Sequence, residues 1–456
     1  MKHPSPQTAS APRSRRAFLA QTGKIAAGTA LAGIALPHVH AAGSDEVRLA
    51  LIGSGNRGSG AVVNAMEATG STTRLWAMAD LFENRLRSAH GILGAKLGGR
   101  CDVPSDRQFV GFDAFRHAID TLRPGSGDVA MLTGYAGFRP RQLEYAVQKG
   151  VNVFMEKSFA VDPPGVRRIV AAGEAAEKKG LKIAAGLMCR HSRNRQELIK
   201  RIQAGELGEI LHTRAYRMGP SGPLGPKPAA TAELEWQLRN FTKFLWVSGG
   251  LYAEMDIHQI DELCWLHDAW PVTAHGVGGR AAGSTDCSQN LDSFSAEWTF
   301  PNGSKAYDTV RYIPKTYAEF ATYVHGTKCA AQFSGNIHAG TVRIFKDQRC
   351  TPDNVAWAAP QEKNTPYHEQ WTDFLDAIRH DKPFNQAKRA ALSNLADIMG
   401  RAAIHMGRVV TWEEALASDF QFFPGSDRLT LESEAPLKAD AAGRYPVPIP
   451  GAWVEI

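Results

Sequence analysis

The sequence lacks the cysteine patterns that build metal centres or disulfide frameworks. A chain of 456 residues does not depend on such cross-links, because it is long enough to bury a sizeable apolar core. We therefore expect no metal site and mostly free, buried thiols. Six cysteines are scattered along the chain without a CxxC pair or a zinc-type spacing: Cys101, Cys189, Cys264, Cys287, Cys329 and Cys350.

The sequence also lacks an apolar run long enough to cross a membrane, which takes roughly 20 residues. The run from Ile25 to Leu36 is only a dozen residues long and is rich in Ala and Gly. It follows the pair Arg15-Arg16 and precedes a Val-His-Ala segment that ends at Ala41 and resembles a signal-peptidase site. This order is typical of a twin-arginine signal peptide, which we assign to residues 1–42. We expect export by the twin-arginine machinery, a periplasmic protein and no stable membrane insertion after cleavage.

Net charge is low once this signal is set aside. Five basic residues and no acidic residue precede Ala41, so the formal net charge of +6 falls to +1. The remaining chain has no basic run with interleaved aromatics, and we expect no nucleic-acid partner. About 415 residues with ample apolar content favour two domains.

A dinucleotide-binding pattern follows the signal. Residues 47–58 read VRLALIGSGNRG, an apolar strand-like run that ends in Gly53-x-Gly55-x-x-Gly58. Gly53 permits a tight turn, Gly55 lets backbone N–H groups approach a pyrophosphate, and Gly58 lets the next helix pack closely. An ordinary strand-to-helix turn is the alternative interpretation.

A distal acid strengthens the dinucleotide interpretation. The apolar run LWAMAD ends at Asp80, 22 residues after Gly58. An acid in this place accepts hydrogen bonds from the adenine ribose and repels a 2′-phosphate, so we expect NAD in preference to NADP. Arg85 or Arg87 would weaken that preference by folding back over the ribose. Further expected cofactor contacts are Asn56 and Arg57 in the loop and Thr133, Glu156 and Lys157 at the ends of later apolar runs.

Periodicity divides the rest of the chain into two predicted domains. Residues 45–188 alternate short apolar runs with helical patterns, which predicts a parallel Rossmann sheet built from βαβ units. Residues 189–456 predict an α+β domain with an open, mostly antiparallel sheet and helices on one face. The predicted strands are 49–53, 75–80, 128–133, 151–156, 182–187, 210–218, 272–280, 293–300, 304–312, 319–325 and 340–345. The predicted helices of the second domain are 198–204, 251–266, 367–379 and 390–406, with an irregular loop over 219–231.

Four segments carry a resemblance to a known family: GSGNRG, VNVFMEKSFA, SGGLYAEMDIHQIDELCWL and GRAAIHMGRVVTWEEAL. In order and spacing they resemble the Gfo/Idh/MocA family, named for glucose-fructose oxidoreductase and inositol dehydrogenase, over nearly the whole mature chain. The resemblance implies a Rossmann domain followed by an open sheet domain, with the nicotinamide of the cofactor between them. It also implies a carbohydrate substrate: a sugar, an inositol, a related polyol or a derivative.

Two departures from the family's pattern bear on its site. Ser158 follows Glu156-Lys157 where the family usually has proline. In the family's helix motif, Glu254 occupies the usual aspartate position and Asp256 replaces a glycine. The acid that partners the histidine of this motif is therefore open between Glu254 and Asp256.

The residue types also indicate alcohol oxidation. Hydride transfer from a carbinol requires a base beside its hydroxyl proton, and His258 suits that role. Glu254 lies four residues earlier, on the same helix face, where a carboxylate can orient the imidazole. Lys157 ends an apolar run, where its ammonium can bind the reacting oxygen or act as the base itself. We take Lys157, His258 and Glu254 as catalytic candidates. One alternative is a structural role for each. Another is metal ligation by Glu254, His258 and Asp261 together.

Candidate substrate contacts flank these residues: Arg190 and His191, Trp236 and Arg239, and Asp256. Aromatic faces beside a guanidinium suit sugar binding, although core packing explains a tryptophan equally well.

Periplasmic location would constrain the mechanism, because that compartment has no maintained pool of free NAD(H). We therefore expect a tightly held cofactor. Two schemes fit: a ping-pong oxidoreductase that uses two sugars, or a redox-neutral glycosidase or lyase that oxidises transiently and then eliminates. A non-catalytic binding protein is a third interpretation, against which the presence of both Lys157 and His258 argues. An open sheet face commonly pairs with its copy, so we expect a homodimer or homotetramer.

Overall fold

The computed structural model describes residues 46–335 and 341–456 of the chain. The expected signal peptide, residues 1–42, lies outside the described residues. In the described ranges, no helix has both the length and the apolar character needed to cross a bilayer. The prediction of free thiols is confirmed, since all six cysteines are free and four of them are buried.

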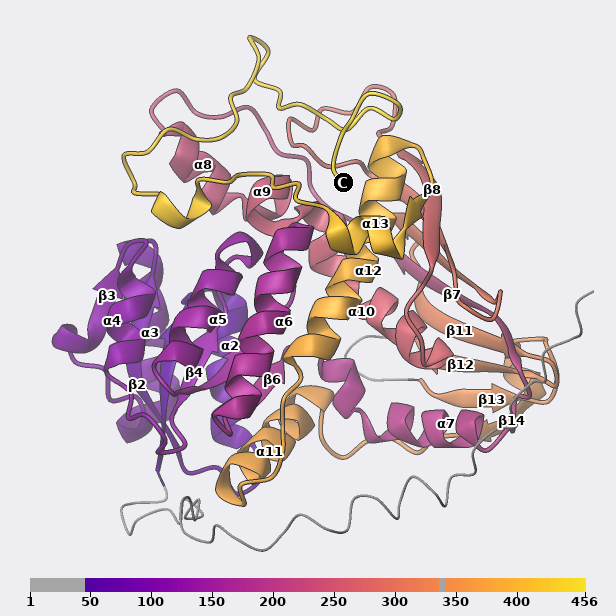
Figure 1. The fold of residues 1–456 in the computed structure, drawn as a ribbon, viewed down its shortest axis with the longest axis horizontal. Coiled ribbons are helices and arrows are strands. Elements are labelled where there is room, and N and C mark those ends of the chain that lie inside the picture. The colour runs from indigo at the N-terminus through magenta and orange to yellow at the C-terminus, as the bar shows by residue number, and fades with distance from the viewer. Residues whose placement is uncertain (1–45, 336–340) are drawn as a thin grey trace, which may run out of the picture. The chain divides into compact units, whose positions relative to one another are not determined.

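A six-stranded sheet in the order β3-β2-β1-β4-β5-β6 forms the core of the N-terminal region (Figure 1). Every strand pair in it is parallel. Because the strand order reverses between β1 and β4, this is the doubly wound arrangement that binds ligands at the carboxyl ends of its strands. The strands are β1 (Val47–Ile52), β2 (Thr73–Asp80), β3 (Gln108–Val110), β4 (Val129–Leu132), β5 (Asn152–Met155) and β6 (Ile183–Ala185).

Helices cover both faces of this sheet, so its central strands are continuously apolar and fully buried. The helices are α2 (Asn56–Glu67), α3 (Glu83–Leu97), α4 (Ala114–Asp120), α5 (Arg139–Gln148) and α6 (Pro163–Lys178). The predicted parallel Rossmann sheet is confirmed, with β3 as a short additional edge strand.

The C-terminal region contains a nine-stranded sheet in the order β14-β13-β12-β11-β7-β10-β9-β8-β15. Its pairs are antiparallel except β10 with β7, which is parallel. The predicted open, mostly antiparallel sheet is therefore confirmed. Its strands are β7 (Ile210–Met218), β8 (Thr273–Gly279), β9 (Ser293–Thr299), β10 (Lys305–Arg311), β11 (Phe320–Gly326), β12 (Ala330–Ser334), β13 (Arg343–Phe345), β14 (Val355–Ala358) and β15 (Val410–Thr411).

Two long helices cover one face of this sheet. In the structure α10 packs against β7, while α12 packs against β8, β9 and α10. Nearly every residue of both helices is buried, because α12 also packs against α6 of the N-terminal region (Figure 1). The helices of this region are α7 (Arg193–Gln203), α8 (Glu233–Arg239), α9 (Leu245–Ser248), α10 (Gly250–His267), α11 (Pro366–Arg379), α12 (Ala387–Met406) and α13 (Trp412–Ala417).

Late segments of the chain complete the core of the first sheet. Helix α11 packs against α2, and the ring of Trp371 stacks on Phe154 with centroids 4.5 Å apart. The two sheets therefore belong to one contact unit rather than to two independent bodies. The division at residue 188 remains a prediction about domain boundaries.

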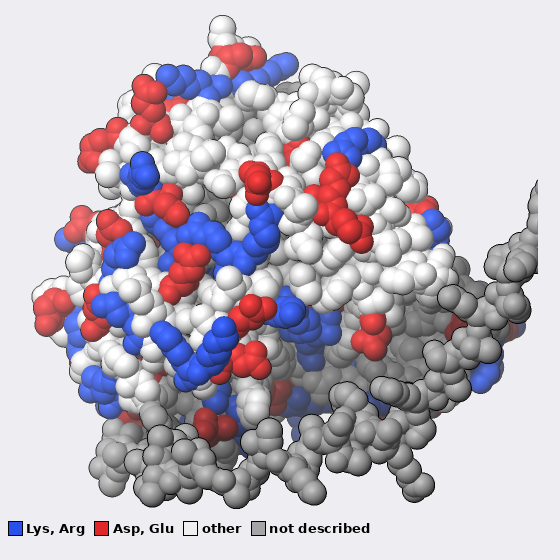
Figure 2. Space-filling view, in the orientation of Figure 1, with Lys and Arg blue, Asp and Glu red and all other residues white. Residues whose placement is uncertain are grey.

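The C-terminal tail after α13 is held by a buried ion network. Glu455 accepts hydrogen bonds from Arg401 and from His405, the latter at 2.6 Å. Burial alone would raise the pKa of Glu455, but Arg401 and His405 lower it to about 2. Tyr445 packs edge-on against Phe244 with ring centroids 4.7 Å apart, so the tail lies along the segment before α10. On the face seen in Figure 2, acidic and basic side chains are interspersed.

Candidate active site

A cleft of about 700 Å³ runs along the carboxyl ends of β1, β2, β4 and β5 and reaches α10. It follows from the parallel sheet, whose strand ends converge where the strand order reverses. All nine residues predicted to contact a cofactor line it: Gly53, Gly55, Asn56, Arg57, Gly58, Asp80, Thr133, Glu156 and Lys157.

The glycines of the loop after β1 are required by close packing. Gly53 has φ +97°, and its N–H donates to the carbonyl of Ala79 at 2.8 Å. A Cβ on Gly58 would lie 2.2 Å from the carbonyl oxygen of Gly53 and 2.6 Å from Oγ1 of Thr133. A Cβ on Gly55 would meet no protein atom within 4 Å, so this position stays open toward the cleft. Gly55 caps α2 without a side chain, which leaves the first N–H groups of the helix for an anion.

Asp80 is fixed by backbone donors at the end of β2. Its Oδ2 accepts from the N–H of Ser54 at 2.7 Å, and its Oδ1 accepts from the N–H of Phe82 at 2.9 Å. Burial raises the pKa of Asp80 above its ordinary value. Each carboxylate oxygen keeps a second lone pair for a ribose hydroxyl.

Aromatic rings line the cleft near Asp80, namely those of Tyr135 and Phe241. The rings of Tyr135 and Phe241 lie 5.2 Å apart, and the guanidinium of Arg239 lies 4.0 Å above the ring of Phe82. Trp236 packs in the same apolar cluster as Phe82. Arg239 and Trp236 thus pack near Phe82 without lining the cleft, and their role as substrate contacts remains a prediction.

The two arginines that follow Asp80 differ in position. Arg85 lines the cleft and donates to the hydroxyl of Tyr135 at 2.7 Å. Arg87 pairs with Glu83 at 2.5 Å on the exposed side of α3. Of the two, only Arg85 faces the place where a ribose would lie.

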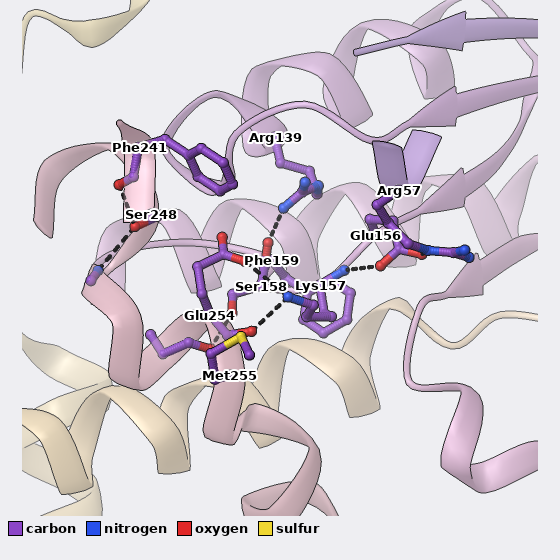
Figure 3. A network of polar contacts seen from close by, with 12 residues as sticks. Arg57, Arg139, Glu156, Lys157, Ser158, Phe159, Phe241, Ser248, Glu254 and Met255 are labelled. Atoms are coloured by element: carbon purple, nitrogen blue, oxygen red, sulfur yellow. Dashed lines mark hydrogen bonds and ion pairs between the residues drawn. The ribbon is translucent and has the colours of Figure 1, made fainter. Parts of the chain in front are cut away.

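Lys157 and Glu254 form an ion pair where the cleft reaches α10. The ammonium of Lys157 donates to Oε2 of Glu254 at 2.9 Å and to its main-chain carbonyl at 2.6 Å (Figure 3). The prediction that Glu254 orients His258 is therefore wrong. The helical spacing of Glu254 and His258 is correct, but a lysine from another element reaches the carboxylate first.

The segment that carries Lys157 is clamped on three sides. Ser158 Oγ donates to the carbonyl of Ala253 at 2.6 Å, which ties the segment to α10, and Arg139 donates to the Ser158 carbonyl (Figure 3). Asn394 Oδ1 in α12 accepts from the N–H of Phe159 at 2.9 Å. These contacts hold the lysine at a fixed depth in the cleft.

Glu156 does not face the cleft as a free carboxylate. Its Oε1 accepts from Nε of Arg57 at 2.7 Å, and its Oε2 accepts from the N–H of Lys157 at 3.2 Å (Figure 3). The guanidinium of Arg57 in turn lies 4.6 Å above the ring of Tyr367, at the start of α11. Glu156 thus connects the glycine loop to the lysine segment.

His258 lies one helical turn after Glu254 and is 5% exposed. Its Nδ1 is buried and has no hydrogen-bond partner within the described ranges. Burial, reinforced by the positive charges of Lys157 and Arg217, holds the pKa of His258 well below its ordinary value. The imidazole is therefore neutral at physiological pH, and it does not line the cleft.

Two predicted substrate contacts, Arg190 and His191, are engaged with other protein groups. Arg190 donates to both carboxylate oxygens of Asp261 at 2.9 Å. His191 uses both ring nitrogens, Nδ1 with Asp373 at 2.7 Å and Nε2 with the amide of Gln386 at 3.1 Å. Arg190 and His191 are thus structural, which corrects their prediction as substrate contacts.

The structure does not support metal ligation by Glu254, His258 and Asp261 on α10. Asp261 also accepts from Arg389 and Ser393, while Glu254 binds Lys157, so these carboxylates do not converge on His258. Within the described ranges, no group of three His, Cys, Asp or Glu side chains is arranged to hold a metal ion.

Asp256 points away from Glu254, as the helical rotation predicts, but it is fully buried. Its Oδ2 accepts from the hydroxyl of Tyr312, beyond the end of β10. Burial and the neighbouring Asp308 hold the pKa of Asp256 well above its ordinary value. Because its carboxyl is fully buried, Asp256 does not contact a substrate, and the prediction that it does is wrong.

Sequence reasoning missed three residues that the fold brings to this region: Asn394, Tyr367 and Arg217. None belongs to a short motif, and each reaches the site from a separate element. The one usable signal was in the alternating run 210–218, where Arg217 interrupts the apolar inner face at Thr213 and Ala215.

Comparison with known proteins gives one family-model match, in the C-terminal region, and one curated relative. A sequence model of the GFO/IDH/MocA C-terminal domain matches residues 196–332. Inositol 2-dehydrogenase 3 of Saccharopolyspora erythraea is 23% identical over 194 residues, which cover 41% of this chain and 51% of that protein. The chain therefore spans about half the length of this curated relative.

Solved structures resemble the chain over most of its length. Aldose-aldose oxidoreductase from Caulobacter crescentus complexed with glycerol superposes with a TM-score of 0.62, at 18% identity over 80% of this chain and 99% of that one. Scyllo-inositol dehydrogenase from Lactobacillus casei with bound cofactor NAD(H) and scyllo-inositol gives 0.59, at 17% identity over 81% and 99%. UDP-N-acetylglucosamine 3-dehydrogenase GnnA from Acidithiobacillus ferrooxidans gives 0.57, at 21% identity over 79% and 98%. At these identities the likeness establishes the shared fold of the two sheets.

Proposed function

We propose that the chain is an oxidoreductase of the Gfo/Idh/MocA type, which transfers hydride between a sugar or polyol and a nicotinamide dinucleotide. One observation carries the proposal: a single cleft leads from the glycine loop and Asp80 to Lys157 and Glu254. A dinucleotide whose pyrophosphate lies at the loop extends along this cleft toward the lysine. The match of residues 196–332 to the C-terminal domain of that family supports the same reading.

The residues present fit a dinucleotide. The uncapped start of α2 offers N–H groups to a pyrophosphate, the open position of Gly55 admits it, and Asp80 offers acceptors to a ribose. Asp80 favours NAD, whereas Arg85 leaves room for NADP. When bound, the nicotinamide ring supplies the hydride acceptor and donor.

The roles of the chain's own residues follow from their charges. Lys157, held by Glu254 at 2.9 Å, donates a hydrogen bond to the reacting oxygen of the substrate. His258 is neutral and takes the proton as the alcohol is oxidised. Glu254 positions the lysine and offsets its charge. In the reverse direction the same groups return the proton.

Export and retention of the cofactor belong to the same proposal. The twin-arginine pattern before Ala41 predicts a periplasmic enzyme, and a cofactor that is not replenished there must stay bound. The rings of Tyr135 and Phe241, which line the cleft 5.2 Å apart, support slow release. The outward face of β7 and β11 carries His212 and His325, stacked 4.5 Å apart, and a self-pairing homodimer or homotetramer through this face is testable by light scattering.

The test is single-turnover reduction of the bound cofactor by a panel of aldoses and inositols, followed by nicotinamide absorbance. We expect at least one of them to reduce it. Lys157→Met and His258→Asn should each slow this step by about 10²- to 10⁴-fold with the dinucleotide retained. Lys149→Met, a surface lysine paired with Asp120, should leave the rate unchanged.

The pH profile separates the two roles. Activity should fall as pH drops through the low pKa of His258, because the protonated imidazole no longer accepts a proton. His258→Asn should lose this acid limb. Wild-type rates in Lys157→Met would contradict the proposal. Release of an aglycone without net absorbance change would indicate elimination instead.

A further inference from the structure

A second cavity, of about 290 Å³, lies beside the cleft and is unused by the roles given above. Helix α10 borders both spaces, with Glu254 lining the first and its helical neighbours Leu251 and Met255 lining the second. The other residues that matter here are Arg217, Ser221, Tyr312 and Phe320. Helix α10 also carries His258, so one helix connects this cavity with the proposed catalytic groups.

Arg217 lies on the inner face of the sheet. Along β7, Thr213 and Ala215 are fully buried against α10, and strand alternation puts Arg217 on the same side. Its directly opposite neighbour on β11 is Phe320. The guanidinium carbon lies 4.5 Å above the Phe320 ring, which fixes the plane of the donors.

The guanidinium of Arg217 forms no ion pair with any residue that the structure describes. Its polar contacts are long: 3.5 Å from Nη1 to the amide oxygen of Gln259 and 3.9 Å from Nη2 to the sulfur of Met255. An arginine that is half-buried in a cavity wall with only these partners keeps donors for a ligand.

The surroundings do not neutralise this charge. The charge of Lys157 is already offset by Glu254, and His258 is neutral. Asp256 interacts electrostatically with Arg217, but it is fully buried and its carboxylate accepts a hydrogen bond from Tyr312. Burial and the neighbouring Asp308 hold the pKa of Asp256 well above its ordinary value. Because no described acid forms an ion pair with Arg217, its guanidinium gives the cavity wall a positive charge, which favours an anionic ligand.

We propose that Arg217 binds the carboxylate of an acidic sugar, so that the preferred substrates are hexuronates or related sugar acids. The proposal rests on the hydride-transfer function assigned to the cleft. Leu251, Met255 and Phe320 offer apolar walls to the C–H face of a sugar ring, and the hydroxyls of Ser221 and Tyr312 offer polar contacts. One guanidinium matches one carboxylate, whereas a phosphate dianion would keep an uncompensated charge.

The experiment uses the full holoprotein and four probes: glucuronate, galacturonate, glucose and galactose. Calorimetry measures binding, and nicotinamide absorbance measures reduction of the bound cofactor. We expect at least one uronate to bind roughly 10- to 100-fold more tightly than its matched hexose. Arg217→Gln should remove that difference without changing hexose binding or dinucleotide content, and Arg217→Lys should restore part of it.

Arg214→Gln is the matched control. Arg214 lies on the same strand but on the outward face, where it contacts Tyr216 and His325. It should leave both uronate and hexose binding unchanged. Equal binding of uronates and hexoses, equal losses for both in Arg217→Gln, or tighter binding of glucose 6-phosphate than of glucuronate would each overturn the assignment of the cavity.

The two measurements separate this proposal from the function on which it rests. If uronates bind in a manner that depends on Arg217 but no sugar reduces the bound cofactor, the subsite is supported and the oxidoreductase function is contradicted. Cofactor reduction by hexoses and uronates alike, with no uronate preference that Arg217→Gln removes, would support the function and remove the subsite.

Discussion

The two ends of the cleft are built in different ways. The nucleotide end consists mostly of backbone, with Gly53 and Gly58 packed against Thr133 and with Asp80 held by main-chain donors. The α10 end consists of side chains from distant segments: Lys157 and Glu254 are 97 residues apart, and Asn394 lies 235 residues from Phe159. A local motif specifies the first end, whereas only tertiary packing assembles the second.

The largest effect is expected from a change that breaks the nucleotide end alone. Gly58→Ala places a Cβ 2.2 Å from the Gly53 carbonyl, so the loop must shift and dinucleotide binding should be lost. Gly55→Ala meets no protein atom, so its thermal midpoint should equal that of the wild type. Calorimetric titration with NAD and a melting curve for each variant measure both.

The two glycine variants also test whether the glycine loop is the element that binds the dinucleotide. If Gly58→Ala binds the dinucleotide as the wild type does, the loop is not the binding element. If Gly55→Ala keeps its stability but loses the dinucleotide, the obstruction is at the ligand, as the open position predicts.

A smaller effect should come from the ion pair beneath the α10 end. Burial alone would raise the pKa of Asp261, but Arg190 and Arg389 keep it below its ordinary value. Arg190→Gln should therefore lower stability by about 2 kcal/mol, while Arg389 retains part of the compensation. Denaturant melts measure this loss. A raised KM with unchanged stability would instead return Arg190 to the substrate contacts.

The stability of the α10 end should depend on pH, because the carboxyl of Asp308 is fully buried there. Burial raises the pKa of Asp308 to about 8. Between about pH 4 and pH 8 the unfolded chain releases this proton while the folded chain keeps it, so stability falls as pH rises. Asp308→Asn should flatten this slope by roughly 1 kcal/mol per pH unit.

Melting curves at pH 5 and pH 7 measure the slope for Asp308→Asn and the wild type. Asp419→Asn serves as the control, because its carboxylate is 93% exposed and should leave the slope unchanged. Parallel slopes in all three proteins would show that Asp308 does not stay protonated in the folded state.

The smallest effects concern the cofactor preference at the nucleotide end. Arg85→Ala should weaken NADP binding about five- to tenfold relative to NAD, because Arg85 lines the cleft beside Tyr135. Arg87→Ala removes an exposed pair with Glu83 and should change neither affinity by more than about twofold. Competition titrations with both dinucleotides measure these ratios, and equal effects of the two variants would contradict the placement of Arg85.

The sequence predicts the elements that have strong local patterns. The five long strands of the second sheet and five strands of the first, all except β3, match their predicted positions within a few residues. Short strands were missed because they lack alternation: β12 reads AAQFS and is buried on both faces, and β15 has only two residues. Their pairing depends on neighbours rather than on their own composition.

The candidate site divides in the same way. Residues of the glycine loop and Asp80 could be predicted because spacing along the chain sets their geometry. The pairing of Glu254 could not, because helical spacing points to His258 while the competing partner, Lys157, arrives from β5. Arg190 and His191 were misassigned for the same reason, since their partners lie on α10 and α11.

The most direct test of the central claim is mass spectrometry of the small molecules released when the purified native protein is denatured. We expect one equivalent of NAD(H) or NADP(H) per chain, held in the native protein in the cleft between Asp80 and Lys157. A protein that releases no dinucleotide and also fails to take up added NAD(H) or NADP(H) would contradict it.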